Sequence, residues 1–191
     1  MKTKLLMLTA VMTCVFAGQA MAMTKEEHKA QGDRISADYK ASRDKCKAMK
    51  DNAKDICVAE AKGNEKIAKA ELEAQYKPSP RNDEKVAVAK GDAAYDVAKE
   101  KCDDLKGNDK DVCVKDAKAA HVKAKENAKV AKASADTNSS NKAENVAETK
   151  KDANAEKREA NYKAAKERCD ALTGNAKDSC QNDAKAKYGM K

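Results

Sequence analysis

The chain has 191 residues, a formal net charge of +8, and charged side chains at 38% of its positions. It contains no tryptophan and one phenylalanine, and its mean hydropathy is −0.90. These figures exclude a conventional globular core, and the abundance of Ala, Lys, Glu and Asp predicts an all-α protein with long solvated helices.

The first element is a segment with the features of a cleavable secretory leader, residues 1–22. Two lysines precede an apolar run from Leu5 to Phe16, and Ala20-Met21-Ala22 forms a small-x-small cleavage site. The run is too short to span a bilayer. We therefore expect cleavage after Ala22, export to a bacterial periplasm, and no membrane span in the mature chain. Removing the leader takes away two lysines, so the charge becomes 38 − 32 = +6.

The mature chain divides into three predicted helical hairpins. The first covers 23–77, with helices at 24–50 and 53–76, and ends where Pro78 and Pro80 interrupt helical sequence. The second covers 78–133, with helices at 83–106 and from Asp109 onward. A polar linker is expected at 134–145, although the sequence leaves open whether helix runs through part of it. The third hairpin at 146–191 has helices at 146–172 and 176–188. The sequence leaves open whether the hairpins pack together or extend.

Each predicted hairpin carries one copy of a repeated stretch with two cysteines eleven positions apart. The pairs are Cys46 and Cys57, Cys102 and Cys113, and Cys169 and Cys180. On one unbroken helix the two cysteines would lie about 16.5 Å apart, whereas a disulfide needs Cα atoms within about 4.4–6.8 Å. If each pair bonds, the chain must reverse between its members. An even number of cysteines in an exported chain predicts a disulfide framework.

The residues between the cysteines have the chemistry of a tight turn. Gly107 and Gly174 suit the left-handed position after a helix, and Asp51 stands there in the first copy. An asparagine then predicts an N-cap, with an aspartate three residues later as in a capping box. These cap residues are Asn52 with Asp55, Asn108 with Asp111, and Asn175 with Asp178.

Larger side chains at equivalent positions are predicted to pack within each hairpin. They are a tyrosine seven residues before the first cysteine and a Met or Leu three residues after it: Tyr39, Tyr95, Tyr162, Met49, Leu105 and Leu172. Small residues should face one another beside each bridge, as in the pairs Ser42 with Ala61, Ala98 with Ala117, and Ala165 with Ala184.

The pattern predicts no catalytic, cofactor-binding or metal site. Structural zinc takes four ligands from closely spaced pairs, whereas no Cys-x-x-Cys occurs and His28 and His121 stand at unrelated positions, where we expect surface residues. Carboxylates alternate with lysines, as on a solvated helix face. Mixed charge, few aromatic residues and export argue against nucleic acid as a partner. An envelope protein or an anionic envelope surface is the expected partner.

The long Ala/Lys/Glu/Asp helices with an export signal resemble the central helical region of TolA-type cell-envelope proteins. The pattern running from Lys101-Cys102 to Cys113 and from Glu167-Arg168-Cys169 to Cys180 also resembles a group of uncharacterised exported Ala/Lys-rich proteins of Gram-negative bacteria. This resemblance covers most of the mature chain. It implies a cell-envelope location and a structural or binding role.

Three functional hypotheses follow. The first is a non-enzymatic periplasmic spacer or adaptor. The second is a hydrophilic stress protectant similar in composition to late-embryogenesis-abundant proteins, which predicts protection of unrelated enzymes during drying. The third is a thiol-redox or metal-buffering protein, which predicts free thiols. Crosslinking in cells, drying assays and thiol titration distinguish the three.

Overall fold

The computed structural model describes residues 23–137 and 140–191. The described residues form six α-helices and no strand, which confirms the predicted all-α fold. The helices are α1 (Lys25–Cys46), α2 (Asp51–Tyr76), α3 (Pro80–Cys102), α4 (Gly107–Ala135), α5 (Lys142–Cys169) and α6 (Gly174–Tyr188). The predicted leader, residues 1–22, lies outside the described residues.

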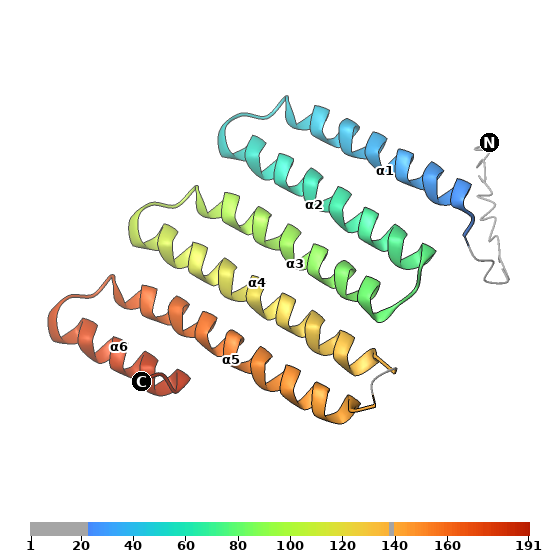
Figure 1. Ribbon diagram of the computed structural model, residues 1–191. Coiled ribbons are helices and arrows are strands. Elements are labelled where there is room, and N and C mark those ends of the chain that lie inside the picture. Colours follow the sequence, from blue (N-terminus) through green and yellow to red (C-terminus); the bar gives the residue numbers. More distant parts are fainter. Residues whose placement is uncertain (1–22, 138–139) are drawn as a thin grey trace, which may run out of the picture.

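The helices run antiparallel, side by side, in one layer (Figure 1). Among the described residues, each helix contacts only the helices next to it in sequence. Helices α1 and α2 form hairpin 1, α3 and α4 form hairpin 2, and α5 and α6 form hairpin 3. The three turns inside hairpins lie at one end of the layer, and the connections between hairpins lie at the other (Figure 1). The hairpins therefore pack successively, a quasi-one-dimensional arrangement typical of repeat proteins.

Two helices begin with side-chain caps that their sequences specify. The Thr24 hydroxyl accepts from the Glu27 backbone N–H, and the Glu27 carboxylate accepts from the Thr24 N–H, which completes a capping box. Helix α3 begins at Pro80, three residues earlier than predicted, with Ser79 as N-cap. Proline fits the first helical position because the N–H that it lacks would have no partner there.

The predicted linker at 134–145 is too long. Helix α4 continues to Ala135 and α5 begins at Lys142, so helix covers both ends of the predicted range. Polar residues with modest helix propensity cost only a few tenths of a kcal/mol each. Packing between α4 and α5 is sufficient to offset that cost.

The buried side chains are mostly alanines and cysteines, with Leu72 as the one larger aliphatic among the described residues. Two glycines allow the backbones to approach closely. A Cβ on Gly63 of α2 would lie 2.7 Å from the Cβ of Ala93 in α3, and one on Gly91 would lie 2.9 Å from the Cβ of Ala124 in α4. Close helix approach thus replaces the bulky apolar core that the composition lacks.

Candidate interaction surface

The three predicted disulfides are present in the described residues. Cys46–Cys57, Cys102–Cys113 and Cys169–Cys180 have Cα–Cα distances of 5.6, 5.6 and 5.7 Å. The first cysteine of each pair is fully buried at the end of its helix. Each bridge therefore joins two antiparallel helices directly beside the turn, as the eleven-residue spacing requires.

The residues expected in the left-handed conformation adopt it. Gly107 and Gly174 have φ of +54° and +55°, and Asp51 has φ of +50°. They are the first residues of α4, α6 and α2, and do not end the preceding helices. Asp51 holds a conformation that costs an L-residue with a Cβ about 1–2 kcal/mol. Hairpin 1 therefore has the least favourable turn of the three.

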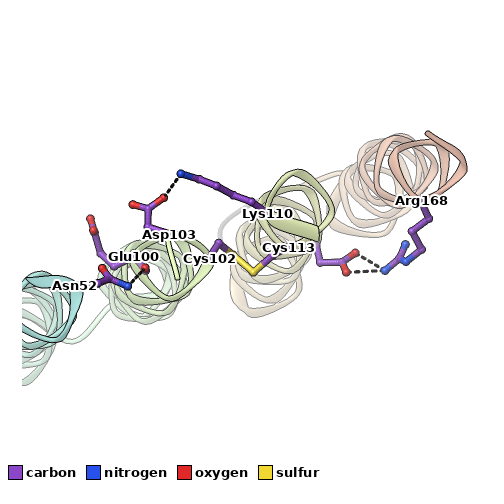
Figure 2. The surroundings of a disulfide bond; sticks show 8 residues. Asn52, Glu100, Cys102, Asp103, Lys110, Cys113 and Arg168 are labelled. Carbon is purple, nitrogen blue, oxygen red and sulfur yellow. Dashed lines mark hydrogen bonds and ion pairs between the residues drawn. A yellow bond between two sulfur atoms is a disulfide. The ribbon is translucent and has the colours of Figure 1, made fainter. Parts of the chain in front are cut away.

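The predicted asparagine caps are wrong. The N-caps of α2, α4 and α6 are Lys50, Lys106 and Thr173, and none makes a side-chain cap hydrogen bond. Because each helix begins at the left-handed residue, the asparagine falls at the second helical position. Asn52 there uses its Nδ2 to donate to the Glu100 carbonyl oxygen in the next hairpin, at 2.7 Å (Figure 2).

The remaining predicted cap residues have no capping role in α2, α4 or α6. Asp55, Asp111 and Asp178 are exposed, Asn108 is half-buried and Asn175 is exposed.

The prediction for Met49, Leu105 and Leu172 is also wrong. They are 46%, 41% and 41% exposed, and they are the exposed large hydrophobic residues of the described chain. The helices end at the first cysteine of each pair, so these side chains belong to the turns and not to a helix face. We call this set of three residues the turn edge. All three lie at the same end of the layer, because the three turns do (Figure 1).

The three tyrosines predicted to pack within the hairpins are half-buried. Tyr39 lines a hollow between α1 and α2 with Ser42 and Ala61, so the predicted facing pair does share this hollow. The Tyr95 ring stacks on His121 of α4 with centroids 4.7 Å apart. Tyr162 is likewise half-buried in α5.

Both histidines bridge helices, contrary to the expected surface positions. His121 Nε2 lies 2.5 Å from Asp92 Oδ1, and the His121 side chain is only 11% exposed. His28 Nε2 lies 2.8 Å from Glu73 Oε1, and its ring packs on Tyr76 with centroids 4.4 Å apart. Each histidine thus joins the two helices of one hairpin at a distance from the disulfide.

Polar contacts join successive hairpins. Arg168 of α5 donates to both carboxylate oxygens of Asp116 in α4, at 2.5 and 2.6 Å. Lys90 of α3 pairs with Glu71 of α2 at 2.7 Å. These pairs are solvent-exposed, so each stabilises by at most about 1 kcal/mol. Figure 2 shows the Cys102–Cys113 bridge with Asn52 of hairpin 1 on one side and Arg168 of hairpin 3 on the other.

Two turns carry an equivalent ion pair. Lys110 Nζ lies 2.9 Å from Asp103 Oδ1, and Lys177 Nζ lies 2.8 Å from Asp170 Oδ1. The hydrogen bond from Lys177 holds the pKa of Asp170 below its ordinary value, and the hydrogen bond to Asp103 raises the pKa of Lys110. The first copy has Lys47 where the others have aspartate, and cannot form this pair.

An open groove runs along one face of the α2/α3 junction. Its two adjoining hollows, of about 560 and 510 Å³, share Lys90. Ile67, Val86 and Val97 supply its larger apolar side chains. Both hollows are largely open to solvent and do not form an enclosed cavity.

Within residues 23–137 and 140–191, no three His, Cys, Asp or Glu side chains gather as a potential metal site. No helix of the described ranges combines the length and the hydropathy of a membrane span. Sequence reasoning missed the contacts between hairpins that Asn52, Asp116 and Arg168 make. Counting from the first cysteine of each repeat gives a signal for one of them, because an acid stands fourteen residues after that cysteine and a base one residue before it in every copy.

Comparisons of the chain with protein-family models, with curated proteins and with solved structures gave no match.

Proposed function

We propose that this chain is a non-enzymatic structural protein of the bacterial cell envelope, a stiff helical spacer or adaptor that binds another envelope protein through its turn edge. The observation that supports the proposal best is the repeated exposure of Met49, Leu105 and Leu172 at one end of the layer. The three side chains stand at equivalent positions of the repeat, so one partner can contact all of them in the same way.

The dimensions of the turn edge favour an elongated partner. Packed helices lie about 8–10 Å apart, so equivalent turns two helices apart are separated by about 16–20 Å. A partner that contacts all three residues must then extend over about 30–40 Å. A single helix of about 20–27 residues has that length. Because three disulfides hold the turns, the apolar side chains are presented with little conformational freedom to lose on binding.

Location in the periplasm is part of the proposal. Disulfides persist in oxidising compartments, and the first 22 residues have the composition of an export signal. The mixture of acidic and basic side chains over every helix suits a solvated spacer better than a nucleic-acid-binding surface.

The test is photo-crosslinking in living cells with a photoreactive amino acid at position 105 of the turn edge. We expect covalent capture of a discrete envelope protein. The control places the same photoreactive amino acid at Thr137, at the opposite end of the layer, where it should not capture that envelope protein.

A second variant separates binding from folding. Replacing Met49, Leu105 and Leu172 together by serine should abolish the crosslink that a photoreactive residue at neighbouring Lys106 makes. Because these side chains are exposed, each substitution should change the free energy of unfolding by no more than about 0.5 kcal/mol. Capture that persists in the triple-serine variant, or equal capture from position 137, contradicts the proposal.

A further inference from the structure

The two outer helices of the layer each have one side without a helical neighbour in the described residues. Helix α1 contacts only α2, and α6 contacts only α5. The equivalent sides of the inner helices do have neighbours: α2 packs on α3, and α4 packs on α5. In both junctions, the second helix of one hairpin meets the first helix of the next. Repeat equivalence therefore allows the outer sides of α1 and α6 to be compared with surfaces whose partner is known.

Small residues on α1 are exposed where their equivalents are buried. Nine residues before the first cysteine, Ala93 of α3 is 7% exposed and meets Gly63, whereas Ala37 of α1 is exposed. Sixteen residues before the cysteine, Ala153 of α5 is fully buried, whereas Ala30 of α1 is exposed. The outer side of α1 thus exposes small residues at positions that are buried in the inner junctions.

The outer side of α6 carries the complementary small position. Seventeen residues after the first cysteine, Gly63 of α2 is buried and Ala119 of α4 is 8% exposed. The equivalent residue of α6, Ala186, is exposed. An alanine at this position admits the same close approach that α4 makes to α5.

One acid–base pair of the inner junctions has an equivalent on the outer sides. The carboxylate fourteen residues after a first cysteine meets the cation one residue before the next, as Asp116 does with Arg168. At the other junction the same two positions, Glu60 and Lys101, line one groove together. On the outer sides these positions hold Asp183 in α6 and Lys45 in α1, again an acid and a base.

We propose that the partner of each outer side is a second copy of this chain. Helix α6 of one molecule packs antiparallel on α1 of the next and repeats the α2/α3 and α4/α5 junctions. Asp183 then pairs with Lys45, and Ala186 approaches Ala37. The two sides differ, so the contact is heterologous and propagates head to tail into open oligomers or closes into a ring.

The contact between molecules is weaker than the contacts within one. Helix α6 has 15 residues, against 26 in α2 and 29 in α4. Ser179 also stands where Ile56 and Val112 occur in the other copies. Less area and less apolar surface make assembly reversible and dependent on concentration. The proposal does not depend on the turn edge, which lies at the ends of the helices and stays open in such an assembly.

The test uses the oxidised mature chain, residues 23–191, and sedimentation velocity over a range of concentrations at low salt. The weight-average mass should rise with concentration. Asp183→Lys and Lys45→Asp each place like charges at the contact and should each raise the dissociation constant by about three- to tenfold. An equimolar mixture of the two variants should regain association, with the two variants alternating along the oligomer. Both contacts between unlike molecules pair an acid with a base, whereas each contact between like molecules opposes two like charges.

A steric block gives an independent measurement. Ala37→Arg should raise the dissociation constant by about tenfold or more, whereas Ala147→Arg, at an exposed position of α5, should leave it unchanged. Far-UV circular dichroism and thiol titration establish that each variant is folded and oxidised. A mass that stays monomeric up to about 1 mM overturns the proposal. So does association that the charge variants leave unaltered, or a mixture that regains nothing.

Discussion

The junctions inside hairpins and the junctions between hairpins hold the same kind of helix by different means. Inside each hairpin a disulfide closes a short turn, and in hairpins 1 and 2 a histidine also bridges the two arms. Between hairpins there is no covalent link beyond the chain itself, and contact rests on Gly63, Ala93 and exposed polar pairs. Close approach of small residues occurs in both kinds of junction, as at Gly91 and Ala124 inside hairpin 2, but only the junctions inside hairpins also depend on redox state.

This contrast explains how so little apolar surface can support an ordered fold. A disulfide stabilises chiefly by restricting the unfolded chain, so it does not need a large buried area. Once the disulfide closes a hairpin, the outer sides of its helices are preformed, and their small side chains allow a neighbouring helix to approach closely. The free energy of folding is then approximately the sum of contributions from the single hairpins and from the junctions between them, as in other repeat proteins.

The largest effect should come from removing the central bridge. Replacing Cys102 and Cys113 together by alanine frees a loop of about a dozen residues and should lower the free energy of unfolding by about 3 kcal/mol. Urea denaturation followed by circular dichroism measures the change. Hydrogen exchange should show lost protection in α3 and α4 first, and an unchanged urea midpoint contradicts a stabilising role for the bridge.

A matched pair of glycines tests the junctions between hairpins. Gly63→Ala places a Cβ 2.7 Å from that of Ala93, so α2 and α3 must separate. We expect a net loss of about 1 kcal/mol, because overpacking outweighs the gain in helix propensity. Thermal unfolding at a fixed protein concentration measures the change.

Gly32→Ala is the control, because its Cβ meets only Leu72 Cδ2 at 3.9 Å. It should stabilise by up to about 1 kcal/mol, since alanine favours the helix more than glycine does. If both substitutions change stability in the same direction, close approach at Gly63 does not limit the junction.

The turns of hairpins 1 and 2 offer a reciprocal exchange. Asp51→Gly should stabilise hairpin 1 by about 1 kcal/mol, because glycine adopts a φ of +50° without a Cβ penalty. Gly107→Asp should destabilise hairpin 2 by a similar amount. Chemical denaturation of both variants, with the disulfides intact, decides the matter. Equal and opposite shifts in the midpoint are the expected outcome, and shifts of the same sign contradict it.

Sequence alone specified the hairpins but not their stacking. Spacing of eleven between Cys102 and Cys113 predicts the bridge, because only a reversed chain satisfies disulfide geometry. The one-layer packing depends on contacts such as Gly63 with Ala93, whose meaning appears only when the register between hairpins is known. Many exposed alanines and acid–base pairs occur in this composition, so no single one identifies a neighbour.

The errors at the turns have one physical origin. Asn52 was expected to cap α2 and Leu105 to pack inside its hairpin, as residues of regular helix ends do. The first helix of each hairpin stops at the first cysteine, three or four residues before its predicted end, and the second helix begins at the left-handed residue, two residues before its predicted start. Asn52 then reaches the next hairpin and Leu105 reaches solvent. The earlier boundaries turn a predicted cap residue into a contact between hairpins and a predicted core residue into an exposed one.

The smallest effect concerns the ion pairs that close two of the turns. The hydrogen bond from Lys177 lowers the pKa of Asp170 below its ordinary value of 3.8. A carboxyl group whose folded pKa is depressed stabilises the protein above its unfolded pKa. That contribution is lost as the pH falls through the folded pKa.

Carboxyl chemical shifts in an NMR titration should place the Asp170 midpoint below that of the same residue in Lys177→Ala. Both groups are exposed, so unfolding midpoints should change little between pH 7 and pH 5, and salt should diminish the difference between the two proteins. An Asp170 midpoint that is the same with and without Lys177 would show that the cross-turn contact is not formed in solution, and only the disulfide and the left-handed residue would then hold the turn.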